Sequence, residues 1–178
     1  MEVRQLPIAG ALQIVPRVFS DDRGSFKETY ALTRYCEAGI DVTFVQDNLS
    51  RSRRHVLRGL HADPRMAKLV QVLAGSAYDI VADVRPQSPT FMRWHALPLR
   101  AGDHTQLYIP AGCLHGFLSL EDDTILAYKQ SAEYDPASEV GVAWNDPDLA
   151  IGWPLGEAAP LLSPKDAANP TLRELGML

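Results

Sequence analysis

Short apolar segments separated by turn residues run along most of the chain, and within them apolar and polar positions alternate. Between residues 67 and 83, two apolar runs meet at Ala74-Gly75-Ser76, which predicts a β-hairpin. Residues 31–40 have the composition of a short helix that ends at Gly39. Many short strands with regular turn signals predict an all-β sandwich or barrel. Further strands are expected over residues 11–19, 25–30, 44–52, 56–61, 91–99 and 124–134, and on both sides of a break at 110–112.

The polar residues within two of these strands are informative. On the second strand of the hairpin, Asp79, Val81 and Asp83 share one face because side chains alternate with a period of two. Two carboxylates on a central strand indicate either a solvated face or the polar interior of a barrel. By the same period, Gln46 and Asn48 lie on one face of the strand over residues 44–52.

Length and composition restrict the classes of protein that the chain can represent. At 178 residues it is expected to form one domain, residues 1–178, with a sizeable core. The net charge of −5 argues against a broad surface for nucleic acid or membrane, so neither is expected as a partner. The sequence contains no membrane-length apolar run and no signal-peptide pattern, and its two cysteines are too few for a disulfide framework. A cytoplasmic protein with reduced thiols is the simplest expectation.

Against this acidic background, residues 51–58 form a basic cluster of four arginines and one histidine. The cluster is either a solvated edge strand or a clamp for phosphate or carboxylate, which arginine binds in bidentate fashion. A small anionic ligand fits better than a nucleic acid, because no stacking aromatic residues interleave the arginines.

The segment over residues 56–68 brings Arg58, His61 and Lys68 close together in sequence. A histidine can accept a proton near neutral pH, and a lysine beside it supplies a fixed positive charge where negative charge develops. The alternative is that His61 and Lys68 merely end a strand, which is the usual role of an isolated histidine.

The sequence P-x-G-x-x-H over residues 110–115 matches the second half of the double motif of cupin-type jelly rolls. The first half of the metal-binding pattern needs H-x-H with a nearby glutamate, whereas this chain has His-Ala-Asp at residues 61–63. Three metal ligands with an open position cannot be assembled at the expected spacing. We therefore expect a cupin-type double-stranded β-helix with short peripheral helices, without a metal and without a cofactor.

Eight short motifs occur in order along nearly the whole chain. Any one would be a weak signal, but together they resemble dTDP-4-dehydrorhamnose 3,5-epimerase and its nucleotide-sugar epimerase relatives. They are D-x-R-G-x-F-x-E (21–28), Q-D-N-x-S (46–50), V-L-R-G-L-H (56–61), D-V-R-x-x-S-P-T (83–90), Y-I-P-x-G-x-x-H-G-F (108–117), Y-K-x-x-x-x-Y-x-P (128–136), W-N-D-P-x-L-x-I-x-W-P (144–154) and S-x-K-D (163–166).

The resemblance implies a dimeric, metal-free cupin that inverts carbons next to the 4-keto group of a nucleotide-linked 6-deoxyhexose. It assigns the general base to His61, the carboxylate that orients this base to Asp166, and the acid on the opposite face to Tyr128. Lys68 corresponds to the residue beside the enolate oxygen, and His115 to a residue of the same barrel interior. The residues that fall where the family binds nucleotide and diphosphate are Arg23, Glu28, Gln46, Asn48, Arg58 and Tyr134. The implied homodimer has pockets that are completed across the interface.

One departure from the family pattern leaves the sugar, the nucleotide and the number of inverted centres open. The loop over residues 62–67 is shorter than expected, and Asp63 replaces the usual glutamine. Because this loop borders the substrate, we hypothesise that only one of C3 and C5 is inverted.

Two other functions remain as alternatives. A nucleotide-sugar 3,4-ketoisomerase would carry R-G-x-H-A-H, of which this chain lacks the second histidine. A non-catalytic sugar-binding barrel would keep Arg58 and Tyr134 but would not need the pair of His61 and Tyr128.

Overall fold

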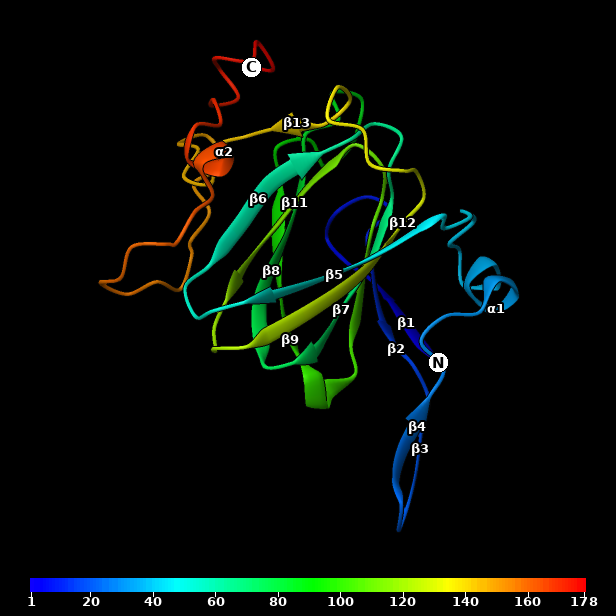
Figure 1. Ribbon diagram of the computed structural model, residues 1–178. Helices are drawn as coiled ribbons and strands as arrows, with labels where there is room; N and C mark the ends of the chain where they lie inside the picture. Colours follow the sequence, from blue (N-terminus) through cyan, green and yellow to red (C-terminus); the bar gives the residue numbers. More distant parts are fainter.

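Two antiparallel sheets pack face to face and form the body of the molecule in the computed structural model, which describes residues 1–178 (Figure 1). In the six-stranded sheet the order is β1 (Glu2–Gln5), β2 (Leu12–Val15), β10 (Gln106–Ile109), β7 (Lys68–Ala74), β12 (Thr124–Gln130) and β5 (Gln46–Ser52). In the five-stranded sheet the order is β13 (Val140–Gly141), β6 (Leu57–Ala62), β11 (Cys113–Ser119), β8 (Ser76–Asp83) and β9 (Trp94–Arg100).

The remaining elements are short and peripheral. They are the hairpin of β3 (Val18–Asp21) and β4 (Gly24–Lys27), the helices α1 (Leu32–Glu37) and α2 (Pro164–Ala167), and the 3₁₀ turn η1 (Ala101–Asp103). This arrangement confirms the expected all-β, cupin-like fold with short outer helices. No helix is long and apolar enough to cross a lipid bilayer.

The main core lies between the two sheets, where residues such as Val70 and Leu126 of the six-stranded sheet pack against Val81 of β8. A second cluster covers the outer face of the five-stranded sheet, where Leu149 and Leu172 of the C-terminal segment pack onto the strands. Because both faces of this sheet are covered, the strands β8 and β11 are buried along almost their whole length. Burial on this scale is the main favourable contribution to the stability of such a fold.

The structure decides the question of the carboxylates on β8. Asp79 and Asp83 are both completely buried, so the solvated-face alternative is wrong and the barrel-interior alternative is confirmed. The carboxylate of Asp83 accepts hydrogen bonds from Arg85 at 2.7 and 2.8 Å and from Thr90 at 2.6 Å. These contacts fix the loop after β8, as expected for a buried charge that is paired and hydrogen-bonded.

Several predicted strand boundaries change. The single strand expected over residues 11–19 is two strands, because the chain breaks at Pro16-Arg17 between β2 and β3. Proline has no backbone N–H to donate to a sheet, which explains the break. The strands expected over 25–30, 91–99 and 124–134 are shorter than expected, and β1 was not predicted. The hairpin at Gly75 and the helix ending before Gly39 are confirmed.

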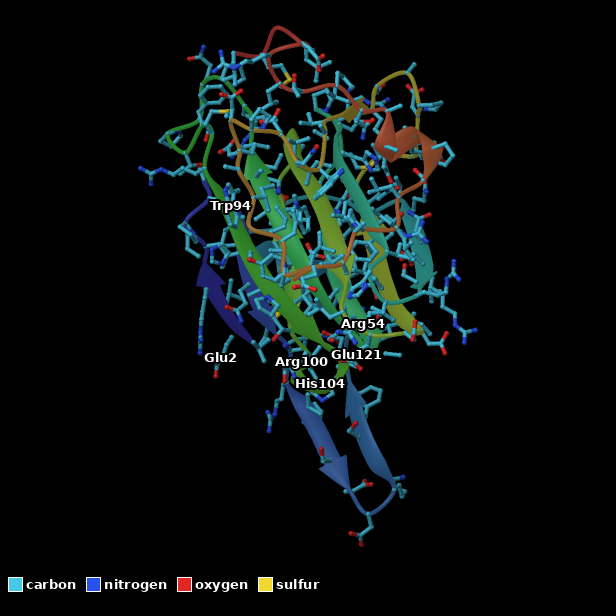
Figure 2. All side chains as sticks on the ribbon, turned by 90° about the vertical axis from the view of Figure 1, so that its left-hand side faces the viewer. Glu2, Arg54, Trp94, Arg100, His104 and Glu121 are labelled. Carbon is cyan, nitrogen blue, oxygen red and sulfur yellow. The ribbon has the colours of Figure 1, made fainter.

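The hairpin of β3 and β4 projects away from the barrel as an arm (Figures 1 and 2). Phe19 and Phe26 lie opposite each other on its two strands, and they are 51% and 70% exposed. A pair of exposed aromatic side chains on a projecting hairpin is an apolar surface that this chain covers only in part, by the guanidinium of Arg17 at 4.7 Å from the centre of the Phe19 ring. Apolar surface of this kind commonly marks a site of contact with another molecule.

Candidate active site

A pocket of about 290 Å³ opens between the two sheets, and its lining is mostly polar. All four predicted catalytic residues line it: His61, Lys68, Tyr128 and Asp166. Three of the predicted substrate-binding residues line it as well: Arg58, His115 and Tyr134. The fold therefore gathers residues from distant parts of the chain into one site.

A local irregularity of β6 directs two of these residues to the same side. Arg58 and His61 are three positions apart, so a regular strand would place them on opposite faces. The register between β6 and β11 shifts at this point, as in a β-bulge, and both side chains line the pocket. The close approach of the strands requires glycine, because a Cβ on Gly59 would lie 2.6 Å from the Cα of Gly116.

The predicted base, His61 of β6, lies on the five-stranded sheet. The Nε2 of His61 lies 2.7 Å from the Oδ1 of Asp166, and the backbone N–H of Asp166 donates to the Oγ of Ser163 at the start of α2. Burial raises the pKa of Asp166, but the hydrogen bond and charge of His61, together with hydrogen bonds involving Ser163 and the backbone of Gly59, outweigh burial and lower the pKa. An ionised carboxylate only accepts hydrogen bonds, so Nε2 carries the proton and Nδ1 is left as the basic nitrogen.

The predicted acid, Tyr128 of β12, lies on the six-stranded sheet and lines the same pocket. Burial raises the pKa of the Tyr128 phenol; the positive charge of Arg58 lowers it and the negative charge of Glu139 raises it further. The phenol is therefore protonated at neutral pH and can donate its proton. A base and an acid on opposing sheets can reach opposite faces of a ring held between them.

Lys68 of β7 is the buried cation of the pocket, with 9% of its surface exposed. Burial lowers the pKa of Lys68, while the negative charges of Glu139, Asp79 and Asp63 oppose this shift. A cation held in such a dry position interacts strongly with negative charge that develops nearby.

His115 lies directly opposite His61 in the register of β11 and β6. The Nε2 of His115 lies 3.0 Å from the Oδ1 of Asp79, whose Oδ2 has no hydrogen-bond partner although it is buried. The structure thus places a second imidazole, supported by a carboxylate, beside the first.

The predicted basic cluster is divided by the structure. Of its arginines, only Arg58 lines the pocket, where its Nε donates to the Oγ of Ser52 at 3.3 Å. Arg51 forms an exposed ion pair with Asp123 at 2.9 Å, and Figure 2 shows Arg54 at the end of the barrel away from α2. The edge-strand alternative applies to Arg51, because β5 is the edge of its sheet, whereas the clamp alternative stays a prediction for Arg58.

Gln46 and Asn48 line an adjoining pocket of about 280 Å³, which shares Tyr128 and Tyr134 with the first. The Nε2 of Gln46 donates to the Oδ1 of Asn48 at 2.9 Å, and the backbone N–H of Tyr134 donates to the Oε1 of Gln46 at 2.9 Å. These residues extend the site beyond the catalytic candidates, on one side of Tyr128.

Arg23 and Glu28 do not reach the pocket of their own chain. Arg23 lies at the tip of the arm and pairs with Asp21 at 2.6 Å, and Glu28 pairs with Arg34 near α1. The structure brings together the other nine predicted residues but leaves these two outside.

Sequence reasoning missed two charged residues of the pocket, Glu139 and Lys165, which form an ion pair. The Nζ of Lys165 also lies 3.4 Å from the Tyr134 hydroxyl. Lys165 could have been predicted because it belongs to the S-x-K-D motif, whereas Glu139 lies in an irregular segment that carries no pattern.

No group of three or more His, Cys, Asp or Glu side chains is arranged to hold a metal ion. The absence of a catalytic metal stays a prediction for elemental analysis.

The short loop after His61 is held by its own charges. The buried carboxylate of Asp63 accepts from the backbone N–H and the side chain of Arg65, both at 2.8 Å. Arg65 also lies 3.6 Å from Asp135, next to Tyr134 of the pocket. Asp63 and Arg65 do not line the pocket themselves, but the loop that they hold connects two residues that do, His61 and Lys68.

A cupin-like barrel with a carboxylate-supported histidine on one sheet and a neutral tyrosine on the other is the arrangement that an enzyme of the epimerase class requires. Comparison with known proteins agrees: the family model for dTDP-4-dehydrorhamnose 3,5-epimerase matches residues 5–174. The chain belongs to the dTDP-4-dehydrorhamnose 3,5-epimerase family.

Individual relatives show the same similarity. The dTDP-4-dehydrorhamnose 3,5-epimerase of Pseudomonas aeruginosa is 46% identical over 93% of this chain and 93% of that protein. The enzyme of the same name from Neisseria gonorrhoeae is 43% identical over 96% of this chain, which spans only 52% of that longer protein. The structure of a 3′-monoepimerase from Streptomyces bikiniensis in complex with dTDP-quinovose has a TM-score of 0.90 and 40% identity, over 97% of this chain and 90% of that one.

Proposed function

We propose that the protein is an epimerase of a nucleotide-diphosphate-linked 4-keto-6-deoxyhexose, with His61 as base and Tyr128 as acid. The observation that carries the proposal is that these two residues line one pocket from opposing sheets. Epimerisation requires removal of a proton from one face of the sugar ring and its return to the other, and two groups across a pocket meet this requirement.

In the proposed reaction, Nδ1 of His61 removes the proton from a carbon next to the ketone. The electron pair of the broken C–H bond moves onto the ketone oxygen, where the charge of Lys68 and the His115 imidazole stabilise the enolate. Asp166 stabilises the imidazolium that forms, as the carboxylate of a catalytic triad does. Tyr128 then gives its phenolic proton to the opposite face of the same carbon, and exchange with solvent returns both residues to their starting states.

The rest of the substrate would occupy the remaining polar walls. Arg58 and Lys165 provide positive charge for the diphosphate, which favours arginine because of its planar donors. Gln46 and Asn48 provide amide groups in the adjoining pocket, beside the ring of Tyr134, where a nucleoside can stack and form hydrogen bonds.

Replacement of His61 tests the assignment of the base. In D2O, the wild-type protein should introduce deuterium into dTDP-4-keto-6-deoxyglucose, as measured by mass spectrometry. A folded His61→Asn variant should incorporate the label more slowly by a factor of about 10²–10⁴, the usual contribution of a general base. Labelling at a rate near that of the wild type would contradict the role of His61.

The protein should act as a homodimer in which the arm of one chain completes the pocket of the other. The arm carries Arg23, whose ion pair is with Asp21 of the same arm, and it exposes Phe19 and Phe26. Exposed strands and apolar surface are liabilities that association removes. Glu28, which follows the arm directly, would approach the partner's site with it.

Mixed dimers test this arrangement. Arg23→Ala and His61→Asn homodimers should both have low activity, but co-expression of the two chains should restore about a quarter of the wild-type value, because the mixed dimer contains one intact pocket. If Arg23 served the pocket of its own chain, co-expression would restore no activity. If Arg23 served no pocket, the Arg23→Ala homodimer would be fully active.

The hypothesis of a single inversion is also part of the proposal. Two inversions require the sugar to present C3 and C5 in turn to the same pair of residues. The contacts of Asp63 with Arg65 support a stiff pocket border that allows one of these positions. A misplacement of about 1 Å can cost on the order of a hundredfold in rate, which is enough to suppress one of the steps.

A further inference from the structure

The pocket has one wall that is purely hydrocarbon. Phe117 of β11 is the only residue of the lining whose side chain carries no polar atom. It is 4% exposed and belongs to the core cluster between the sheets, against which Tyr128 packs. Because Phe117 is anchored in the core, its ring forms a fixed apolar surface on one wall of an otherwise polar site.

The position of Phe117 relative to its neighbours is specific. It follows His115 by two residues on the same strand face, and the two rings are stacked with centroids 6.5 Å apart. Across the strand pair, it lies opposite Arg58 of β6. The ring of Phe117 therefore lies between His115, which is expected at the ketone oxygen, and Arg58, which is expected at the diphosphate.

The covalent structure of the substrate has a matching order. In a 4-keto-6-deoxyhexose, C5 lies between the ketone carbon C4 and the ring oxygen, which leads to C1 and its diphosphate. C5 carries the methyl group C6, the only apolar substituent of the ring, whereas the opposite edge carries the hydroxyls of C2 and C3. A ring bound by its ketone and its diphosphate thus presents its methyl group between them, where this pocket has its apolar wall.

We propose that Phe117 contacts the C6 methyl group and is the residue by which the enzyme selects 6-deoxy sugars over sugars with a 6-hydroxyl. The inference rests on the proposed function and adds the determinant of substrate choice. A hydroxyl at C6 would lose its water against the ring of Phe117 without gaining a partner there. Apolar sites reject a substrate with one added hydroxyl by about a hundredfold.

The experiment compares kcat/KM for a nucleotide-linked 4-keto-6-deoxyhexose with that for the corresponding 6-hydroxy sugar. The variants are Phe117→Met and Phe117→Gln, which have similar volumes but differ in polarity, and thermal melting verifies their folding. The wild type should prefer the 6-deoxy sugar by about a hundredfold. Phe117→Met should retain most of this preference, and Phe117→Gln should lose at least tenfold of it.

Equal preference in the two variants, or a wild type that uses both sugars equally well, would overturn the role of Phe117 and leave the proposed function intact. If Phe117→Gln does not fold, the ratio of kcat/KM for the two sugars in the wild type and in Phe117→Met still tests the role of Phe117. Loss of the preference in Phe117→Met, or its absence in the wild type, would then contradict the inference. A wild type that turns over neither sugar would instead refute the proposed function, and the role of Phe117 with it.

Discussion

The Nε2 of His61 lies 2.7 Å from the Oδ1 of Asp166, which is 105 residues further along the chain. The strand β6 holds the imidazole, and the short helix α2 holds the carboxylate at the other side of a partly buried contact. The orientation of the base therefore depends on the irregular C-terminal segment, although that segment contributes little to the two sheets.

The first prediction concerns this contact. Asp166→Asn should lower kcat by about 10²–10⁴ with a smaller change in KM, because an amide neither fixes the required tautomer nor stabilises the imidazolium. Steady-state kinetics measure the effect. The matched control is Asp123→Asn, which removes an exposed carboxylate paired with Arg51 and should retain full activity. An Asp166→Asn enzyme within a few-fold of the wild type would show that His61 does not need the carboxylate.

The second prediction separates proton removal from proton return. In Tyr128→Phe, His61 can still remove the substrate proton and return a solvent deuteron to the same face. Exchange should therefore continue while inversion falls by about 10²-fold or more. NMR in D2O measures both rates in one sample. Equal loss of exchange and inversion would mean that Tyr128 acts in enolate formation and not as the acid.

The third prediction gives the pH dependence of inversion. The pKa of Tyr128 is raised by burial, so the donating phenol remains protonated up to a pH above the ordinary tyrosine value of about 10. Loss of the phenolic proton should therefore lower inversion only above that value, and this decline should be absent from the residual rate of Tyr128→Phe. Loss of charge from Lys68, whose pKa is lowered, would lower the rate of both proteins alike. A decline well below pH 9 that Tyr128→Phe retains would assign the alkaline limit to another group.

The fourth prediction is that replacement of Lys68 lowers activity without lowering stability. Burial lowers the pKa of Lys68, so its charged form is less stable in the fold than in the unfolded chain. Lys68→Met should therefore leave the melting temperature unchanged or raise it, because it removes the desolvation cost of the ammonium, which outweighs the attraction of the nearby carboxylates. The same variant should lower kcat by about 10²–10³, the usual cost of removing one group that stabilises an oxyanion. Lower stability together with normal turnover would contradict the proposed role.

The sequence was sufficient for the residues whose pattern is local. The hairpin at Gly75 has strong turn chemistry, and Arg58, His61 and His115 belong to contiguous motifs. The alternation of side chains along β8 left either a solvated face or the barrel interior possible for Asp79 and Asp83. Burial decided between them, and it depends on the packing of the two sheets against each other, because Val81 on the same face of β8 lies in the core between them.

Other features depend on long-range packing that no local pattern carries. The ion pair of Glu139 and Lys165 joins an irregular segment to the start of α2. The resemblance implied that Arg23 and Glu28 bind substrate, but only the folded chain shows that they lie away from their own pocket. Phe117 was visible only as part of a motif, and its place between His115 and Arg58 follows from strand register.

The most direct test of the account is NMR of dTDP-4-keto-6-deoxyglucose in D2O with the wild-type protein, following C3 and C5 separately. The account predicts that deuterium enters next to the ketone together with inversion of the labelled carbon, and the single-inversion hypothesis predicts this at one of the two positions only. Label at both positions at similar rates, with a doubly inverted product, would overturn the single inversion and leave the epimerase. A 3-keto product labelled at C4 would instead indicate a ketoisomerase. No label at all would indicate a binding protein, and either of these last two results would contradict the central claim.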